Sequence, residues 1–347
     1  MKVAIVTRDE PHHKHLCVRL AEKYNVVGIL HPVVRSGADR LRRLRNWART
    51  YGWPLALLSA SAAAPDVVSG WTMKAELARA EERHYGRFVA EYEKLDPRLI
   101  HREVDVRSPA ARELLGRLDP DVVVALGGPI YPPELIASCR LILNFHSGIS
   151  PIYNGSSTIN FAFANGHPHL CGGTLMKMSA VIDGGAILAH YLPSIEADDS
   201  PVSLFMKTVG GAATLYERFL SANSAGVPLR CIPQAPPLFY YRYSNWSLYQ
   251  SQLVAHYLRT GLAGKHLRSE RIVEYWNAST DEDAHERYRR TIDNLLWANP
   301  TRSVLGLRRL ADRETATGSI RDDQDMDRVS SAKLRTVDVV ERWRARS

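Results

Sequence analysis

Short, continuous apolar runs alternate with amphipathic segments over the first two thirds of the chain. Lys2–Thr7 and Val26–Leu30 are apolar runs rich in β-branched residues, and between them Leu16 and Leu20 recur at helical spacing. A strand, a helix and a second strand in this order are typical of the beginning of a parallel α/β domain. Asp121–Leu126 adds an apolar run that suits a central strand, because a parallel sheet is covered on both faces.

Segments of both kinds continue as far as residue 220. Leu141–Phe145 is the next apolar run, and Gly172–Met178 and Ala186–Tyr191 have the composition of two further strands. Apolar residues at helical spacing predict four more helices, which are Trp71–Tyr92, Ser108–Leu118, Ser157–Asn165 and Pro201–Leu220. Together these elements predict an α/β fold for residues 1–225, with a doubly wound and mostly parallel sheet.

The pattern changes at about Gly226. Four prolines mark a linker there, and the stretch from Tyr240 to Tyr249 is crowded with aromatic residues. The remaining sequence is rich in arginine and lacks sustained strand alternation, which predicts a mainly helical C-terminal appendage over residues 226–314 and a flexible tail over residues 315–347. We interpret the aromatic stretch as a core of this appendage or as a contact in a homodimer rather than as a platform for a substrate, because Tyr and Trp are enriched in cores and interfaces.

Composition and charge narrow the kinds of partner. The 347 residues carry a formal net charge of +8, which suits anionic partners such as nucleotide-linked substrates, folates or nucleic acid. We interpret the arginine-rich segment Ala38–Trp47 as a solvated helix face rather than as a nucleic-acid contact. Four cysteines without metal-ligand spacing indicate a reduced protein with no metal site. The N-terminal apolar run is too short for a signal peptide, and no run is long enough to span a bilayer, so we expect a cytoplasmic protein without a membrane partner.

The turns after the predicted strands exclude two common nucleotide sites. Thr7–Pro11 follows the first strand and contains no G-x-G-x-x-G, which disfavours a nicotinamide dinucleotide, and the chain has no P-loop. Gly127-Gly128-Pro129 follows the central strand instead. Glycine lets a ligand approach the backbone closely, and ligands of doubly wound sheets bind at the carboxyl ends of the strands.

Three residues supply the groups that acyl transfer between two nitrogens requires. Asn144 and His146 end a predicted buried strand, and Asp183 begins an Asp-Gly-Gly step. An amide can donate hydrogen bonds to an oxyanion, an imidazole can move a proton, and a carboxylate can orient the imidazole or relay its proton. Each residue alone would more often cap a turn or satisfy the structure, so it is their combination that points to catalysis.

A larger pattern surrounds these residues. A buried strand ends in Asn144-Phe145-His146, a Pro-x-Tyr-x-Gly turn follows at Pro151–Gly155, and Ile182–Ile187 reads Ile-Asp-Gly-Gly-Ala-Ile. The pattern resembles the folate-dependent formyltransferase family, which includes methionyl-tRNA, glycinamide ribonucleotide and sugar-amine formyltransferases. The resemblance covers about residues 1–220 and is most specific over residues 121–188.

The resemblance implies a role for each matching position. Asn144, His146 and Asp183 fall on the catalytic residues of the family, and the co-substrate would be 10-formyltetrahydrofolate. The positions that fall where the family binds the pterin, largely through backbone groups, are Ala125, Leu126, Gly127, Gly128 and Ile130 after the central strand, and Ser179, Ala180, Val181 and Ile182 in the later loop. We expect Tyr153 and Lys177 to contact the acceptor.

Departures from the family pattern concern the acceptor. The family commonly has His-Pro-Ser-Leu-Leu-Pro where this chain has His146–Pro151 as His-Ser-Gly-Ile-Ser-Pro, and Asn154 replaces a basic residue. The sequence favours the primary amine of a small molecule as acceptor, either an amino sugar, which a nucleotide could carry, or another specialised metabolite. A methionyl-tRNA formyltransferase, with tRNA as partner, and a non-catalytic folate- or RNA-binding module are the alternatives.

Overall fold

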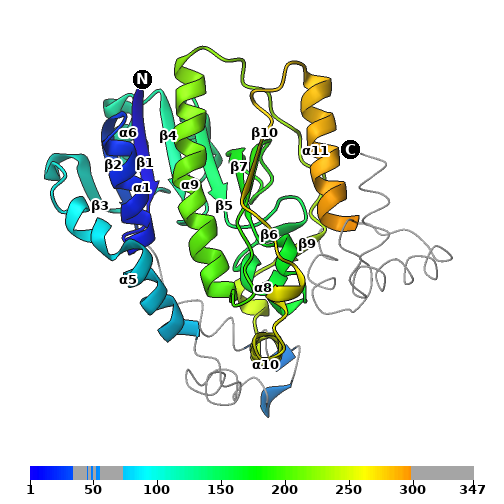
Figure 1. Ribbon diagram of the computed structural model, residues 1–347. Helices are drawn as coiled ribbons and strands as arrows, with labels where there is room; N and C mark the ends of the chain where they lie inside the picture. The colour runs from blue at the N-terminus through cyan, green and yellow to red at the C-terminus, as the bar shows by residue number, and fades with distance from the viewer. Residues whose placement is uncertain (34–44, 46–47, 50–51, 55–72, 298–347) are drawn as a thin grey trace.

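The computed structural model describes residues 1–33, 45, 48–49, 52–54 and 73–297. Figure 1 shows its central feature, an eight-stranded sheet ordered β10-β8-β7-β5-β4-β1-β2-β3. The strands are β1 (Lys2–Thr7), β2 (Asn25–Pro32), β3 (Ile100–Val104), β4 (Val122–Leu126), β5 (Ile142–His146), β7 (Gly173–Lys177), β8 (Ile187–Leu192) and β10 (Arg271–Glu274). The predicted helix Ala38–Trp47, apart from residue 45, and the predicted tail 315–347 lie outside the described residues.

The sheet has a parallel half and an antiparallel half. β3, β2, β1, β4 and β5 run parallel to one another, whereas β7, β8 and β10 are added antiparallel beside β5. β1 pairs with both β2 and β4, so the order of strand addition reverses there. The prediction of a mostly parallel, doubly wound α/β sheet is therefore confirmed.

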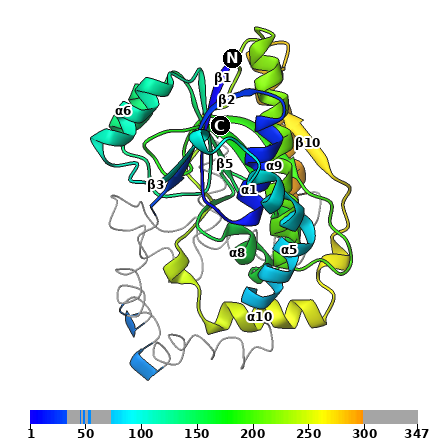
Figure 2. The ribbon, with the colours of Figure 1, turned by 90° about the vertical axis from the view of Figure 1, so that its left-hand side faces the viewer.

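Helices cover both faces of this sheet. Figure 2 shows α6 (Pro109–Leu118) on one side and α1 (Pro11–Ala21), α5 (Met73–Tyr92) and α9 (Pro201–Ser224) on the other. Alternate residues of β1 divide between two cores, since Val3 and Ile5 pack with α1, α5 and α9, whereas Ala4 and Val6 pack with α6 and α7 (Pro133–Ser138).

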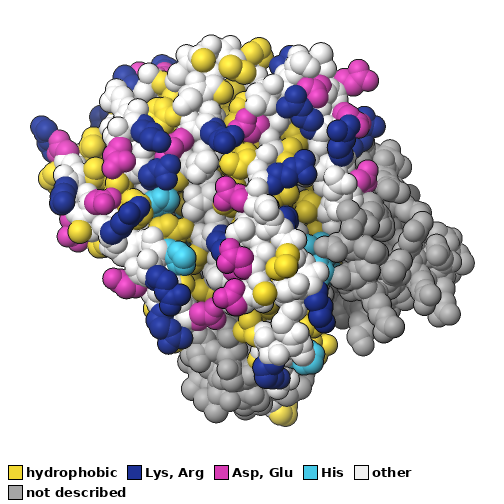
Figure 3. Space-filling view, viewed as in Figure 1, with side chains coloured by type: hydrophobic (Ala, Val, Ile, Leu, Met, Phe, Trp, Pro, Cys, Tyr) yellow, Lys and Arg dark blue, Asp and Glu magenta, His cyan; other side chains and the backbone are white. Residues whose placement is uncertain are grey.

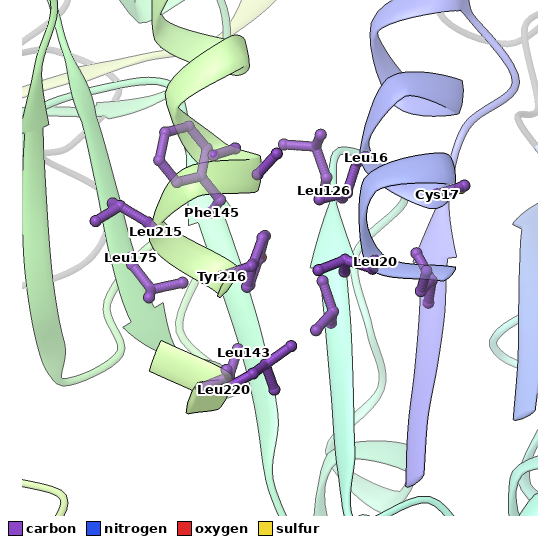
Figure 4. Close-up of a cluster of buried hydrophobic side chains, with 14 of the residues drawn as sticks. Leu16, Cys17, Leu20, Leu126, Leu143, Phe145, Leu175, Leu215, Tyr216 and Leu220 are labelled. Carbon is purple, nitrogen blue, oxygen red and sulfur yellow. The ribbon is translucent and has the colours of Figure 1, made fainter. Parts of the chain in front are cut away.

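The longest helix, α9, fixes the middle of the sheet. Ser200 and Ser203 form a capping box at its beginning, and Pro201 occupies the first turn, where proline costs no hydrogen bond. Figure 4 shows Leu215, Tyr216 and Leu220 of α9 packed toward Leu126, Leu143 and Phe145 of β4 and β5. The helix predicted over Pro201–Leu220 is confirmed and continues for one more turn.

The region after Gly226 is mainly helical, as predicted, and it also contributes strands. Residues 226–297 contain the α-helices α10 (Leu248–Arg259) and α11 (Asp281–Trp297). β10 extends the central sheet beside β8, and β9 (Phe239–Tyr241) forms a small parallel sheet with β6 (Tyr153–Gly155). Chain beyond Gly226 is thus built into the sheet and into the loop that follows β5.

Part of the aromatic stretch packs against a hydrophobic core. The Tyr241 ring stacks on Phe161 of α8 (Thr158–Ala164) with centroids 4.0 Å apart, and Trp246 meets the same phenyl ring edge-on at 5.1 Å. Tyr243 and Tyr249 are 44% and 62% exposed. Tyr241 and Trp246 are thus partly buried against a core that includes Phe161, so they join this stretch to residues before Gly226 rather than form a core of the appendage alone.

Charge on the face that carries α9 is mixed. Figure 3 shows basic and acidic side chains interspersed there, so the net positive charge of the chain is not gathered on this face. None of the described helices combines the length and the apolar composition needed to cross a bilayer.

Candidate active site

Asn144 and His146 project from one face of β5. Leu143 and Phe145 belong to the core under α1 and α9, whereas Ile142 belongs to the core under α6 and α7. Because side chains alternate along a strand, Asn144 and His146 lie on the same face as Ile142. Within the described residues, the Asn144 carboxamide makes no hydrogen bond, so it can still take a partner.

Both ring nitrogens of His146 face oxygen atoms. Nε2 lies 3.0 Å from the carbonyl oxygen of Tyr153, and Nδ1 lies 3.4 Å from Oδ1 of Asp183. A carbonyl oxygen only accepts hydrogen bonds, so this geometry places a hydrogen on Nε2. Nδ1 therefore faces the Asp183 carboxylate across the 3.4 Å contact. His146 is 7% exposed, which keeps this pair out of bulk water.

Asp183 is held in an unusual backbone conformation. Its φ of 51° lies in the left-handed region, which is uncommon for a residue other than glycine. Gly155 N donates to Asp183 Oδ2 at 2.9 Å, and Asn154 Nδ2 donates to the Asp183 carbonyl oxygen at 3.0 Å. Two residues of β6 therefore fix both the side chain and the main chain of Asp183.

Gly185 closes the turn that carries Asp183. A Cβ at this position would lie 1.7 Å from the carbonyl oxygen of Lys177, a distance that no side chain tolerates. The glycine of the Asp-Gly-Gly step thus lets β7 and β8 approach closely enough to form their hairpin.

Buried hydrogen bonds order the loop between β5 and β6. Thr174 Oγ1 accepts from Ser150 N at 2.8 Å and donates to Gly148 O at 2.6 Å. His190 bridges the Ser150 carbonyl oxygen and the Tyr275 hydroxyl, each at 2.8 Å. Burial lowers the pKa of His190 to about 4, so at neutral pH its ring donates to Ser150 and accepts from Tyr275.

The nine positions at which we expected pterin contacts differ in accessibility. Ala125 and Leu126 are buried, and their carbonyl oxygens already accept hydrogen bonds from Tyr216 Oη and Thr7 Oγ1, respectively. Their side chains therefore offer no surface to a ligand, and a pterin contact at these two positions stays a prediction. The accessible positions follow β4 at Gly127, Gly128 and Ile130, and lie in the β7–β8 loop at Ser179, Ala180, Val181 and Ile182.

The accessible positions include exposed apolar side chains. Ile130, Val181 and Ile182 are 54%, 68% and 42% exposed, although side chains of this kind are usually buried. Gly127 and Gly128 have φ values of 66° and 110°, which leave their backbone groups open to a ligand. Apolar surface beside open peptide groups suits a flat, partly apolar ligand with a polar edge.

Of the two residues expected at the acceptor, Tyr153 does not lie at an accessible position. Its side chain is fully buried, and its hydroxyl bonds to His167 Nδ1 at 2.9 Å and accepts from Asn165 Nδ2 at 3.0 Å. Burial raises the pKa of this phenol well above its usual value. Tyr153 serves the site through its carbonyl oxygen instead, while Lys177 lies half-buried at the end of β7 and remains a predicted acceptor contact.

Two residues near Asp183 were not predicted as functional. Asn154 was noted only as a departure from the family pattern, and Gln234 lies in the proline-rich linker, where nothing in the sequence marks it. Gln234 Nε2 donates to the carbonyl oxygen of Gly185 at 2.6 Å. Among the described residues, no group of three or more His, Cys, Asp or Glu side chains is placed to hold a metal ion.

The three residues of the candidate site lie in a segment that matches a known protein family. Residues 57–219 match the family model described as formyl transferase, and Asn144, His146 and Asp183 lie within this match. The chain therefore contains a formyltransferase domain.

Proteins with similar sequences include methionyl-tRNA formyltransferases. That of a Nitratiruptor species is 36% identical over 140 residues, which are 38% of this chain and 46% of the relative. That of Chlorobium chlorochromatii is 28% identical over 134 residues, which are 37% of this chain and 42% of the relative. The chain thus spans less than half the length of these relatives. Among solved structures, a sugar N-formyltransferase from a Shewanella species aligns with a TM-score of 0.44 and 16% identity, over 74% of this chain and 87% of that one.

Proposed function

We propose that this protein, whose chain contains a formyltransferase domain, transfers the formyl group of 10-formyltetrahydrofolate to the primary amine of a small acceptor. The observation that carries the proposal is the contact of His146 Nδ1 with Asp183 Oδ1 at 3.4 Å, on the sheet face that Asn144 also occupies. This arrangement joins a proton-transfer pair to an amide donor, which are the groups that acyl transfer between nitrogens requires.

The residues around β4 and the β7–β8 loop fit the co-substrate. The exposed side chains of Ile130, Val181 and Ile182 would contact the pterin ring, and the open backbone at Gly127 and Gly128 would bind its polar edge. When bound there, 10-formyltetrahydrofolate supplies a formyl group attached to nitrogen.

Three residues of the chain carry the reaction. As the acceptor nitrogen bonds to the formyl carbon and the bond to the donor nitrogen breaks, negative charge develops on the formyl oxygen. Asn144 Nδ2 donates to that oxygen, and one such donor typically lowers a barrier by about 3–4 kcal/mol. The His146–Asp183 pair takes the proton that leaves the attacking amine and returns one to the departing nitrogen, a role worth about 10²–10⁴-fold in rate.

An amino sugar, free or nucleotide-linked, is the acceptor that we favour. Residues 226–297 form α10 and α11 and add only the short strands β9 and β10, so the described part of the region after Gly226 forms no β-barrel, which favours a small acceptor over tRNA. Formylation of methionyl-tRNA is the second candidate, because the relatives that match at 36% and 28% identity carry that name.

A product assay decides between these acceptors. The protein would be incubated with 10-formyltetrahydrofolate and, separately, with free amino sugars, nucleotide-linked amino sugars, methionyl-tRNA or buffer alone. We expect the mass of one formyl group to be added to an amino sugar. Formylation of methionyl-tRNA alone would establish the second candidate, and binding of folate or tRNA without any transfer would establish a non-catalytic module.

Substitutions test the assigned roles. We expect His146→Ala and Asp183→Asn each to lower kcat by about 10²-fold or more, because each removes half of the proton-transfer pair. His256→Ala and Asp198→Asn change exposed residues of the same types and serve as controls. Activity of either active-site variant within a few-fold of wild type, at unchanged thermal stability, would overturn its role.

A further inference from the structure

We propose that Gln234, which lies beyond the matched formyltransferase segment 57–219, is a positioning residue for Asp183. The inference rests on the proposed function, since it concerns the residue that would move the proton. It assigns a specific task to residues 232–241, here termed the return segment, which come back to the active site after α9 has ended.

The return segment follows the active-site loop along its length. Ile232 exchanges two backbone hydrogen bonds of 2.8 Å with Ile187, the first residue of β8. Further on, Leu238 N and Phe239 N donate to the carbonyl oxygens of Pro151 and Ile152, each at 2.8 Å. The segment is therefore fastened at one end to the strand after Asp183 and at the other end to the loop before β6.

Gln234 lies between these two attachments and bonds both to the Asp183 turn and to β6. Its Nε2 donates to Gly185 O at 2.6 Å, two residues after Asp183. Its Oε1 accepts from Asn154 Nδ2 at 3.5 Å, and the same Nδ2 donates to Asp183 O at 3.0 Å. One carboxamide thus links the turn to β6 through a donor and an acceptor at once.

β6 is the element through which this link reaches both catalytic side chains. The first and last residues of β6 contact them, since the Tyr153 carbonyl oxygen faces His146 Nε2 and Gly155 N donates to Asp183 Oδ2. β9 of the return segment pairs in parallel with β6 and places Tyr153 opposite Phe239. The return segment thereby supports the His146 contact through β9 and the Asp183 contact through Gln234.

The bonding capacity of Asn154 explains why Gln234 is needed. Asn154 is 2% exposed, and its Oδ1 has no hydrogen-bond partner among the described residues, so its orientation depends on its Nδ2 bonds alone. Those bonds go to Asp183 O and to Gln234. Removing Gln234 leaves Asn154 with a single bond and leaves the Gly185 carbonyl without its side-chain donor. The left-handed backbone of Asp183 then loses part of what holds it in place.

Gln234→Met is the test, because methionine keeps the length of the side chain and removes both hydrogen bonds. We expect kcat to fall about tenfold to a hundredfold, with the KM for the amine within about threefold, since displaced catalytic groups affect the transition state more than binding. We also expect the ¹⁵N resonances of the His146 ring, identified by their loss in His146→Ala, to shift. Gln252→Met, an exposed glutamine of α10, is the matched control.

Gln234→Glu provides a second variant should Gln234→Met fold poorly, since it keeps the Oε1 acceptor and loses the donor to Gly185. A kcat within about twofold of wild type, or a lower kcat with unchanged His146 resonances, overturns the positioning role. If the wild-type protein formylates no amine, the proposed function fails. The ring resonances of His146 then still decide whether Gln234 positions the pair.

Discussion

At the scale of single residues, Gly148 determines where His146 can lie. A Cβ at position 148 would come within 2.4 Å of both His146 Nε2 and the Tyr153 carbonyl oxygen. The φ of Gly148 is not in the left-handed region, so this close approach alone requires glycine. Gly148 is part of the loop sequence His146–Pro151 that departs from the family pattern. The departure thus includes the glycine that lets His146 Nε2 contact the Tyr153 carbonyl oxygen.

We expect Gly148→Ala to lower kcat by about tenfold to a hundredfold, because the methyl group displaces His146 or the Tyr153 carbonyl by a sizeable fraction of 1 Å. Gly116→Ala on α6 is the control, since a Cβ there meets nothing within 4 Å. That control should stabilise the helix by up to about 1 kcal/mol and leave kcat unchanged. Steady-state kinetics with the identified amine make the comparison, and equal kcat values for the two variants would contradict the packing argument.

At the scale of elements, the sequence predicted the buried strands and not the edge strands. β1, β4 and β5 are continuous apolar runs, because both of their faces are covered by helices. β3 reads Ile-His-Arg-Glu-Val, half-exposed at one sheet edge, and β10 is a strand of only four residues at the other edge, far along the chain from the strands beside it. Such strands are set by their neighbours, so local pattern does not mark them.

The residues of the candidate active site also differ in whether the sequence alone predicts them. Asn144 and His146 could be predicted, because the end of a buried strand and the family motif coincide there. The burial of the Tyr153 side chain could not be predicted, because residue order does not tell which face of a three-residue strand turns inward. Gln234 approaches Asp183 only through the course of the return segment, which contains three prolines and aromatic residues but no periodic pattern.

Buried histidines and an arginine join several elements on the side of the sheet away from β3. Arg268, just before β10, donates to the carbonyl oxygens of His169, Cys171 and Pro193 at 2.8–3.0 Å. The His169 ring stacks on His266 with centroids 4.8 Å apart, and its ring nitrogens have no hydrogen-bond partner among the described residues. Burial, with His167, His266 and Arg268 nearby, lowers the pKa of His169 to about 3.

This cluster predicts a loss of stability in acid. An unfolded histidine has a pKa of about 6.5, so between that value and the native value of about 3 the unfolded state binds more protons. The contribution to stability is complete above pH 6.5 and decreases by about 1 kcal/mol per pH unit as the pH falls toward 3. We expect His169→Phe to retain the ring stack and to show a smaller loss between pH 6.5 and pH 4. Urea unfolding across that range measures it, and parallel profiles for the two proteins would refute the assignment.

At the scale of the whole molecule, the region after Gly226 shares two hydrophobic cores with the residues before it. The first is the core under α1 and α9, and the second includes residues of α8 and α11, whereas the core under α6 and α7 has no described member after residue 226. Trp276 is 1% exposed and meets Phe219 of α9 edge-on at 5.4 Å, within the core under α1 and α9. Tyr288 and Ile292 of α11 belong to the second core together with Phe161 and Leu204. Since neither core is complete without residues after 226, the described parts of the chain should unfold as one unit.

Trp276→Ala tests this unity. The substitution opens a cavity between α9 and the end of β10, and we expect it to lower the free energy of unfolding by about 3–5 kcal/mol. In a single cooperative unit, the slowest amides of β1, in the middle of the parallel half, should exchange faster by the same free energy, although β8, β7, β5 and β4 separate β1 from β10 in the sheet. Tyr249→Ala is the control, because that side chain is 62% exposed and its removal should change the free energy by about 0.5 kcal/mol or less. If exchange accelerates only in residues 226–297 while the β1 amides stay protected, the C-terminal region is a separate folding unit, and it could then be lost without disturbing the sheet that carries Asn144 and His146.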